Sequence, residues 1–234
     1  MNKKQFYDHI RPRLFKGGIG NRQFQGMEYI LSEWGETGFT DYRWLTYALA
    51  TTYHETARTM QPIKEKGGKA YFMRMYDKSG NRPHVARRLG NTQVGDGAKF
   101  CGRGYVQLTG RTNYGRASRA LGIDFVASPA RVMEPDLAAF IMFTGMKQGW
   151  FTGKSFRTYI RGDVCDYKNA RKIINGLDEA STIAGYAEVF DEGLQLAGAS
   201  VQEPRPVPIP TAPDTQPTTL FGLILTLIRS MFGK

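Results

Sequence analysis

The sequence contains only two cysteines, Cys101 and Cys165, and three histidines among 234 residues. Two thiols cannot form a disulfide framework, so we expect both cysteines to be reduced. The histidines and cysteines also lack the spacing of metal ligands, so no metal or other cofactor is expected. No apolar run follows the basic N-terminus, and we therefore expect no secretory signal peptide.

The chain has no excess of acidic residues: 32 Lys and Arg stand against 21 Asp and Glu, a net charge of +11. The whole excess lies in residues 58–119, which hold fourteen basic and three acidic residues. A helix-turn-helix, zinc-finger or RNP-type motif is missing, so no nucleic acid partner is expected. The basic segment can concentrate an anionic polymer near the protein, or it can be a solvated face that keeps the protein soluble.

Composition and periodicity predict a mainly helical globular protein. Hydrophobic residues make up 41% of the chain and aromatic residues 12%, which is enough for one sizeable core. Apolar spacing predicts helices over residues 135–150, 163–174 and 183–197, the first of them apolar nearly all round. The interval 67–104 is rich in Gly, Asn and Arg, and this composition predicts a loop or a short hairpin.

A further predicted helix, over residues 41–56, ends in His54 and Glu55. One face of this helix is apolar and should be packed; it carries Trp44, Leu45, Ala48, Leu49 and Thr52. Glu55 would lie at the negative end of the helix dipole in partly apolar surroundings. Both effects disfavour the charged carboxylate, as a general acid working near neutral pH requires. The alternative is an ordinary exposed Glu at a helix end.

Two glycine-containing motifs follow this helix. Residues 102–115 read Gly-Arg-Gly-Tyr-Val-Gln-Leu-Thr-Gly-Arg-Thr-Asn-Tyr-Gly, and residues 173–176 read Ile-Ile-Asn-Gly. Together with Tyr-His-Glu-Thr at 53–56, they resemble glycoside hydrolase family 19, which holds chitinases and many phage endolysins. The resemblance covers roughly residues 20–198. It implies a mainly α, lysozyme-like α+β fold, in which a large helical lobe and a small irregular or hairpin lobe flank a cleft.

The same resemblance implies roles for individual residues. Glu55 would be the general acid, Glu65 would activate a water molecule, and Thr109 would help to hold that water. The residues that would bind substrate are His54, Gln107, Asn113 and Asn175. Asp77 is the alternative base, because it lies at nearly the spacing found in plant members of the family.

Other kinds of site fit these residues less well. The His54-Glu55 pair would indicate a zinc protease only with His at position 58, which is Arg58. Cys101 could be a nucleophile with a histidine as its base, but an isolated buried thiol is the commoner explanation. Gly102 and Gly104 form an incomplete phosphate-binding pattern. These glycines more plausibly let the backbone pass close to a sugar or a neighbouring helix.

The composition changes sharply near residue 200. We expect a catalytic domain over residues 1–199, a Pro-rich linker over 200–217 and an amphipathic apolar tail over 218–234. A helix of about thirteen residues reaches only ~20 Å, short of the ~30 Å hydrocarbon core of a bilayer. We therefore expect the tail to contact the outer membrane or anionic lipid as an interfacial helix, or else to dock on the enzyme or a second copy.

The resemblance and the basic charge together predict an endolysin that hydrolyses the glycan strands of peptidoglycan by an inverting two-carboxylate mechanism and lyses its host. We expect it to be a monomer. Such an enzyme would be made in the host cytoplasm and act on the cell wall in the periplasm. A chitinase of the same family is the first alternative. A protein without catalytic activity that acts on membranes or binds the wall is the second.

Overall fold

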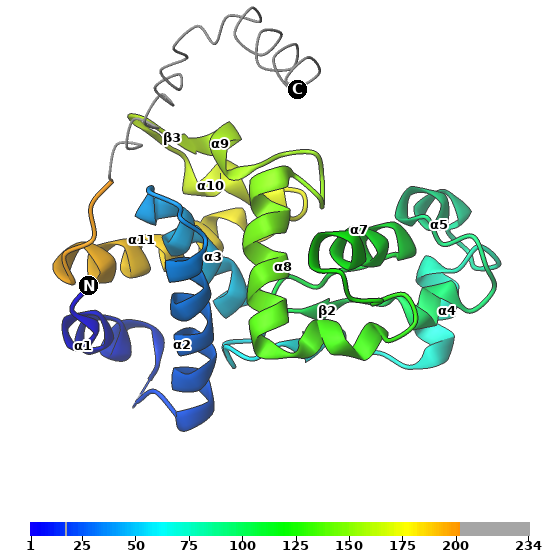
Figure 1. Cartoon of the computed structure of the whole chain (residues 1–234), viewed down its shortest axis with the longest axis horizontal. Helices are drawn as coiled ribbons and strands as arrows, with labels where there is room; N and C mark the ends of the chain where they lie inside the picture. Colours follow the sequence, from blue (N-terminus) through cyan, green and yellow to red (C-terminus); the bar gives the residue numbers. More distant parts are fainter. Residues whose placement is uncertain (17, 202–234) are drawn as a thin grey trace, which may run out of the picture. The chain divides into compact units, whose positions relative to one another are not determined.

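The computed structural model describes residues 1–16 and 18–201, which are mostly helical (Figure 1). The predicted tail and all but the first two residues of the predicted linker lie outside the described residues. No helix in the described part is long and apolar enough to cross a membrane. The elements in chain order are α1 Lys3–Leu14, α2 Asn21–Glu36, α3 Tyr42–Glu55, β1 Ile63–Lys64, α4 Lys69–Tyr76, α5 Pro83–Leu89, α6 Asp96–Lys99, β2 Arg103–Gly104, α7 Arg111–Leu121, η1 Pro129–Met133, α8 Pro135–Gln148, α9 Phe156–Tyr159, β3 Ile160–Arg161, β4 Val164–Cys165, α10 Tyr167–Ala170, η2 Arg171–Ile173 and α11 Ala180–Leu196.

Helix α3 is the central helix of what we call the helical body, formed by α1, α2, α3, α8 and α11. It begins where the Asp41 carboxylate accepts a hydrogen bond of 3.2 Å from the backbone N–H of Arg43. Every residue from Trp44 to Tyr53 is buried. The sequence predicted a single packed face, but α3 is enclosed on all sides. Its small Ala and Thr residues let neighbouring helices approach on the sides that lack large side chains.

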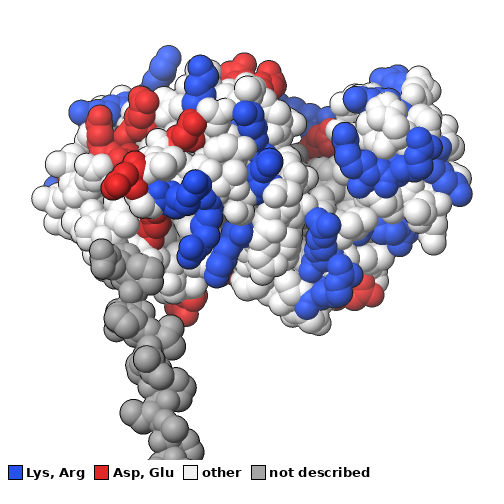
Figure 2. Space-filling model, turned by 90° about the horizontal axis from the view of Figure 1, so that it is seen from above, with Lys and Arg blue, Asp and Glu red and all other residues white. Residues whose placement is uncertain are grey.

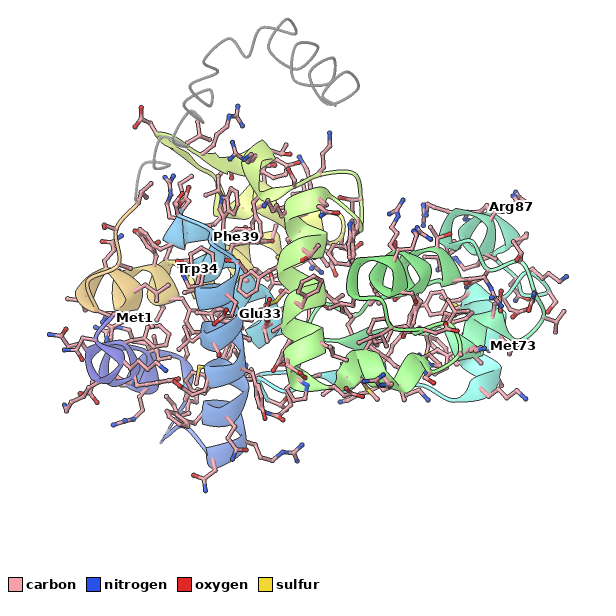
Figure 3. The ribbon with its side chains drawn as sticks, in the orientation of Figure 1. Met1, Glu33, Trp34, Phe39, Met73 and Arg87 are labelled. Carbon is pink, nitrogen blue, oxygen red and sulfur yellow. The ribbon has the colours of Figure 1, made fainter. Side chains whose placement is uncertain are left out.

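Aromatic contacts fix the start of α3. The Trp44 ring stacks on Phe156 with 5.1 Å between ring centroids, and its indole N–H donates to the carbonyl of Ile160 at 3.1 Å. Trp34 and Phe39, labelled in Figure 3, meet edge to face at 5.8 Å. The end of α2 is thereby tied to the start of α3 through a continuous apolar cluster.

The helices predicted over 135–150 and 183–197 are present as α8 and α11. The prediction of one helix over 163–174 was wrong, because this stretch divides into β4, α10 and η2. The chain turns at Gly162, which has a φ of 49° that favours glycine, and β3 then pairs with β4. The Asp166 carboxylate accepts from the N–H of Asn169 at 2.9 Å and starts a new short helix.

Residues 65–102 form what we call the small lobe, at the right of Figure 1. Its two ends meet in the antiparallel pair β1–β2, where Ile63 faces Gly104. The sequence predicted a loop or short hairpin here. That prediction was wrong for the interior, which contains α4, α5 and α6. The residues that indicated a loop are helix caps: Gly68 precedes α4, and Gly90 ends α5 with a left-handed φ of 69°.

Asp77 holds the small lobe together. Its side chain is fully buried and accepts hydrogen bonds from the N–H and hydroxyl of Ser79 and from the N–H groups of Gly95 and Gly97, over 2.8 to 3.2 Å. Burial alone would raise the pKa of Asp77. The hydrogen bonds outweigh burial and hold this pKa below its ordinary value. The carboxylate therefore joins the end of α4 to the start of α6.

We expect Asp77→Asn to lower the free energy of unfolding by about 2 to 4 kcal/mol near neutral pH, because an amide N–H would face donors that need an acceptor. The folded pKa of Asp77 is lowered, so its stabilisation is complete above the ordinary value of ~3.9 and is lost as the pH falls through the folded value. Urea unfolding at neutral and strongly acidic pH measures both effects. The exposed control Asp163→Asn should cost under ~0.5 kcal/mol, and equal losses in the two variants would contradict the role of Asp77.

Candidate active site

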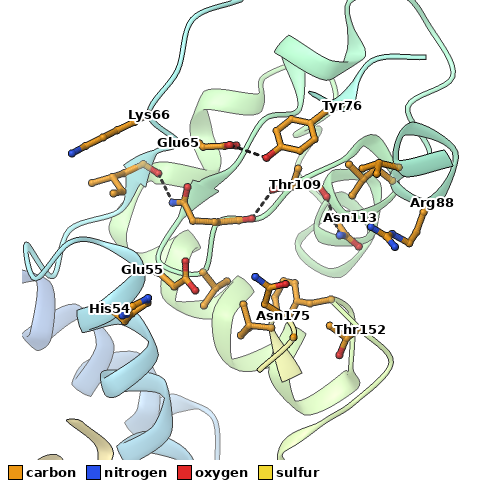
Figure 4. Close-up of a pocket in the computed structure, with 18 of the residues that line it drawn as sticks. His54, Glu55, Glu65, Lys66, Tyr76, Arg88, Thr109, Asn113, Thr152 and Asn175 are labelled. Carbon is orange, nitrogen blue, oxygen red and sulfur yellow. Dashed lines mark hydrogen bonds between the residues drawn. The ribbon is translucent and has the colours of Figure 1, made fainter. Parts of the chain in front are cut away.

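A pocket of about 860 Å³ lies where the end of α3, the small lobe, the start of α7 and the segment after η2 converge (Figure 4). The sequence predicted a cleft between two lobes, and this pocket is lined by residues of both. All of the predicted site residues line it: His54, Glu55, Glu65, Gln107, Thr109, Asn113 and Asn175. The alternative base, Asp77, does not line it and is buried inside the small lobe.

Glu55 is the last residue of α3 and lies at the wall formed by the helical body. Its Oε1 accepts from Nη1 of Arg171 at 2.5 Å, and the two side chains are 16% and 4% exposed. Arg171 also donates through Nε to the carbonyl of Asp178 at 3.0 Å. The sequence predicted surroundings that disfavour the charged carboxylate. The sequence did not predict the guanidinium of Arg171, which lies directly against this side chain.

Glu65 follows β1 and faces the pocket from the small lobe. One of its carboxylate oxygens accepts from the Tyr76 hydroxyl at 2.8 Å, and the other accepts from the N–H of Gly102 at 3.1 Å. Burial, followed by the hydrogen bond and charge of Glu65, raises the pKa of Tyr76. The hydroxyl therefore stays protonated and remains a donor. Two neutral donors thus hold the Glu65 side chain in place.

The Gln-Leu-Thr motif forms the wall between the two carboxylates. Gln107 has a φ of 56°, which is uncommon for a residue other than glycine. Its amide donates to the carbonyls of Ile63 and Gly104, both at 3.2 Å. The Thr109 hydroxyl donates to the carbonyl of Gln107 at 2.8 Å, and Asn113 donates to the carbonyl of Thr109 at 3.0 Å. Because the hydroxyl proton of Thr109 is engaged, its oxygen is left to accept a hydrogen bond from the pocket.

The glycines of this motif serve close backbone approach. A Cβ on Gly102 would lie 2.9 Å from the side-chain oxygen of Gln107 and 3.1 Å from Oε2 of Glu65. A Cβ on Gly110, whose φ is 90°, would lie 2.6 Å from the carbonyl oxygen of Leu89. Side chains at these two positions would displace Glu65 or separate α5 from α7. Gly102 therefore lets the backbone approach Glu65, and Gly110 lets it approach the end of α5.

Two functional candidates were missed by the sequence reasoning. Arg171 is separated by 116 residues from Glu55, and its only signal was its position four residues before Asn175. The backbone N–H of Asn175 donates to the Arg171 carbonyl at 3.0 Å, so Asn175 in the pocket lining is joined to the residue that contacts Glu55. Tyr76 had no signal, because its contact with Glu65 depends on the helix α4, which was not predicted.

The other candidate chemistries lack the necessary neighbours. Cys101 is buried, and burial raises the pKa of its thiol, which disfavours the reactive thiolate. Arg103, between the motif glycines, is also buried and donates to the Lys99 and Cys101 carbonyls and the Tyr114 hydroxyl. Within residues 1–16 and 18–201, no group of three or more His, Cys, Asp or Glu side chains could hold a metal ion.

Basic side chains surround one side of the pocket. Lys66 and Arg88, from the small lobe, line it and are exposed. Figure 2 shows many Lys and Arg side chains over the small lobe, at the right, whereas Asp and Glu gather more at the left. Eight of the fourteen basic residues of 58–119 lie in the small lobe, and two of these, Lys66 and Arg88, line the pocket.

Comparison with known proteins identifies the family. The family model described as chitinase class I, of glycoside hydrolase family 19, matches residues 30–163. Chitinase C from Streptomyces griseus HUT6037 has 19% sequence identity over 86% of this chain and 78% of that chain, with a TM-score of 0.53. A class IV chitinase from Zea mays has 17% identity over 85% of this chain and 93% of that chain, with a TM-score of 0.48. No curated protein sequence matches the chain. Because the family model covers more than half of its residues, the chain belongs to glycoside hydrolase family 19 and is a mainly helical, lysozyme-like glycoside hydrolase.

Proposed function

We propose that this enzyme hydrolyses the glycan strands of bacterial peptidoglycan with inversion at the anomeric carbon. The observation that carries the mechanism is that Glu55 and Glu65 enter one pocket from different lobes (Figure 4). An inverting enzyme needs room for a water molecule between its two carboxyl groups, which are typically about 6.5 to 9.5 Å apart. The pocket, at about 860 Å³, has space for sugar rings and for that water.

Glu65 is the proposed base. Its two hydrogen bonds, from Tyr76 and Gly102, fix its position facing the pocket, where it would draw a proton from water. With its other O–H group the water would donate a hydrogen bond to the Thr109 oxygen. The hydroxyl of Thr109 itself donates to the Gln107 carbonyl. With both of its protons directed at protein oxygens, the water presents a lone pair to the anomeric carbon.

Glu55 is the proposed acid. It would protonate the glycosidic oxygen as the bond breaks, which leaves Glu55 as a carboxylate. Arg171 lies against that carboxylate and stabilises it at this stage. His54, Asn113 and Asn175 line the same pocket and are placed to bind sugar hydroxyl and acetamido groups.

Charge favours peptidoglycan as the substrate. Chitin is a neutral polymer, whereas the peptide stems of peptidoglycan carry carboxylates. The pocket rim carries Lys66 and Arg88, and the small lobe around them is strongly basic. Such a rim attracts an anionic polymer and has no comparable effect on a neutral one. Chitin oligomers are the second candidate substrate, since the related solved structures are chitinases. Digestion of purified peptidoglycan and of chitin oligomers, followed by mass spectrometry, decides between them and names the bond that is cut.

The acid and base are tested by single substitutions. We expect Glu55→Gln and Glu65→Gln each to lower turnover by about 10² to 10⁴-fold with the fold retained, because an amide neither donates the acid's proton nor accepts one from water. Asp77→Asn, assayed where it remains folded, should have a much smaller effect. A larger loss in Asp77→Asn than in Glu65→Gln would make Asp77 the base.

Tyr76 should act by positioning Glu65. We expect Tyr76→Phe to lower kcat about tenfold with little change in KM, because Glu65 would lose one of its two donors while the sugar contacts remain. Tyr29→Phe, at a half-exposed tyrosine of α2, is the matched control and should leave kcat unchanged. Steady-state kinetics on a soluble oligomer measures both. A rise in KM alone would show that Tyr76 contacts substrate instead.

The charge argument predicts different salt dependence on the two substrates. Activity on cell walls should fall as the ionic strength rises above ~0.1 M, where the Debye length is about 10 Å. Activity on a neutral chitin oligomer should change little over the same range. Initial rates at a series of salt concentrations make this comparison. Equal sensitivity on both substrates would mean that the basic surface serves solubility.

A further inference from the structure

A second pocket, of about 530 Å³, opens between α7 and the end of α8. Its lining includes Arg116, Arg119 and Trp150. The mechanism uses none of these residues, and the family motifs do not contain them. Trp150 is only 8% exposed, and its indole N–H donates to the side chain of Gln148, another lining residue, at 2.9 Å.

The second pocket lies next to the main one along α7, and the two share no lining residue. Asn113 lines the main pocket, and Arg116 is three residues further along α7, on the same face and about 4.5 Å along the axis. Nη1 of Arg116 lies 3.3 Å from Oδ1 of Asn113. On the opposite wall, Phe151 lines the main pocket and the adjacent Trp150 lines the second. A substrate longer than the main pocket can therefore extend over Arg116.

The charge of the second pocket suits an anion. Arg116 and Arg119 are three residues apart on one helix face, where like charges repel each other. Among residues 1–16 and 18–201, no carboxylate forms an ion pair with either of them. Arg116 donates one N–H to the carbonyl of Trp150 at 2.6 Å, near the negative end of α8. Two full positive charges outweigh the roughly half charge of that helix end.

Arg119 is free to meet a ligand. It is exposed, and its Nη1 lies 3.6 Å from where a Cβ of Gly115 would be, so the side chain turns back along α7 over the glycine. The structure describes no side-chain hydrogen bond of Arg119 within the residues it covers. Its guanidinium can thus offer paired N–H groups, the arrangement that binds carboxylates in a bidentate manner.

We propose that the pocket of Arg116, Arg119 and Trp150 is a subsite for a carboxylate of the peptide stem that peptidoglycan carries and chitin lacks. This inference rests on the proposed function, because it names the substrate group that the same cleft would recognise. Arg119 supplies the main ionic contact, and Arg116 adds charge while its guanidinium is held by the Trp150 carbonyl.

Binding of a small probe tests the subsite directly. The probe is N-acetylmuramyl dipeptide with free carboxylates, compared with the same compound amidated, and the readout is the NMR signal of the Trp150 indole N–H. We expect the free acid to shift this signal and to bind about three- to tenfold more weakly to Arg119→Gln, with part of the loss restored in Arg119→Lys. The amidated compound should bind both proteins equally weakly.

The matched control is Arg87→Gln. Arg87 is exposed on α5 at the tip of the small lobe, as Figure 3 shows, and it belongs to the same basic segment without lining either pocket. Its removal changes the net charge equally and should leave probe binding unchanged. Equal weakening in Arg87→Gln and Arg119→Gln would overturn the subsite, as would equal binding of acid and amide. Failure of the unaltered enzyme to cleave peptidoglycan would instead overturn the proposed function, whatever the probe shows.

Discussion

The contact between Glu65 and Gly102 is the constraint on which the site depends. The N–H of Glu65 donates to the carbonyl of Gly102 at 2.8 Å, and the N–H of Gly102 donates back to the Glu65 carboxylate at 3.1 Å. This pair closes the small lobe, whose first and last residues are these two. It also brings the proposed base against Gln107, since a Cβ at position 102 would meet both side chains. The glycine motif and the carboxylate are therefore parts of one arrangement.

The site was largely predictable because most of its residues occur in short, local motifs. Glu55 ends a helix whose pattern is clear, and Gln107, Thr109 and Asn113 lie within seven residues of one another. Residues that are so near in sequence remain close in space whatever fold the segment adopts. The small lobe was less predictable because its glycines and proline serve as helix caps, and a composition count cannot separate a cap from a loop.

Long-range contacts account for the rest of what the sequence did not predict. The approach of Arg171 to Glu55 joins α3 to η2, in a stretch that was expected to be one continuous helix. The sequence correctly placed Glu55 at the end of a helix, but it did not predict the neighbouring Arg171. A charge at 2.5 Å acts more strongly on a carboxylate than the half charge of a helix terminus. The polar surroundings of Glu55 therefore depend on tertiary contacts.

The two carboxylates are supported in physically different ways. Glu55 belongs to the helical body, where α3 is buried along nearly its whole length, so its position is fixed by packing. Glu65 belongs to the small lobe, whose internal order depends on the buried carboxylate of Asp77. Because the pKa of Asp77 is lowered, that support persists in mild acid, down through its ordinary range near ~4. Loosening of the lobe that carries Glu65 should therefore begin only below that range.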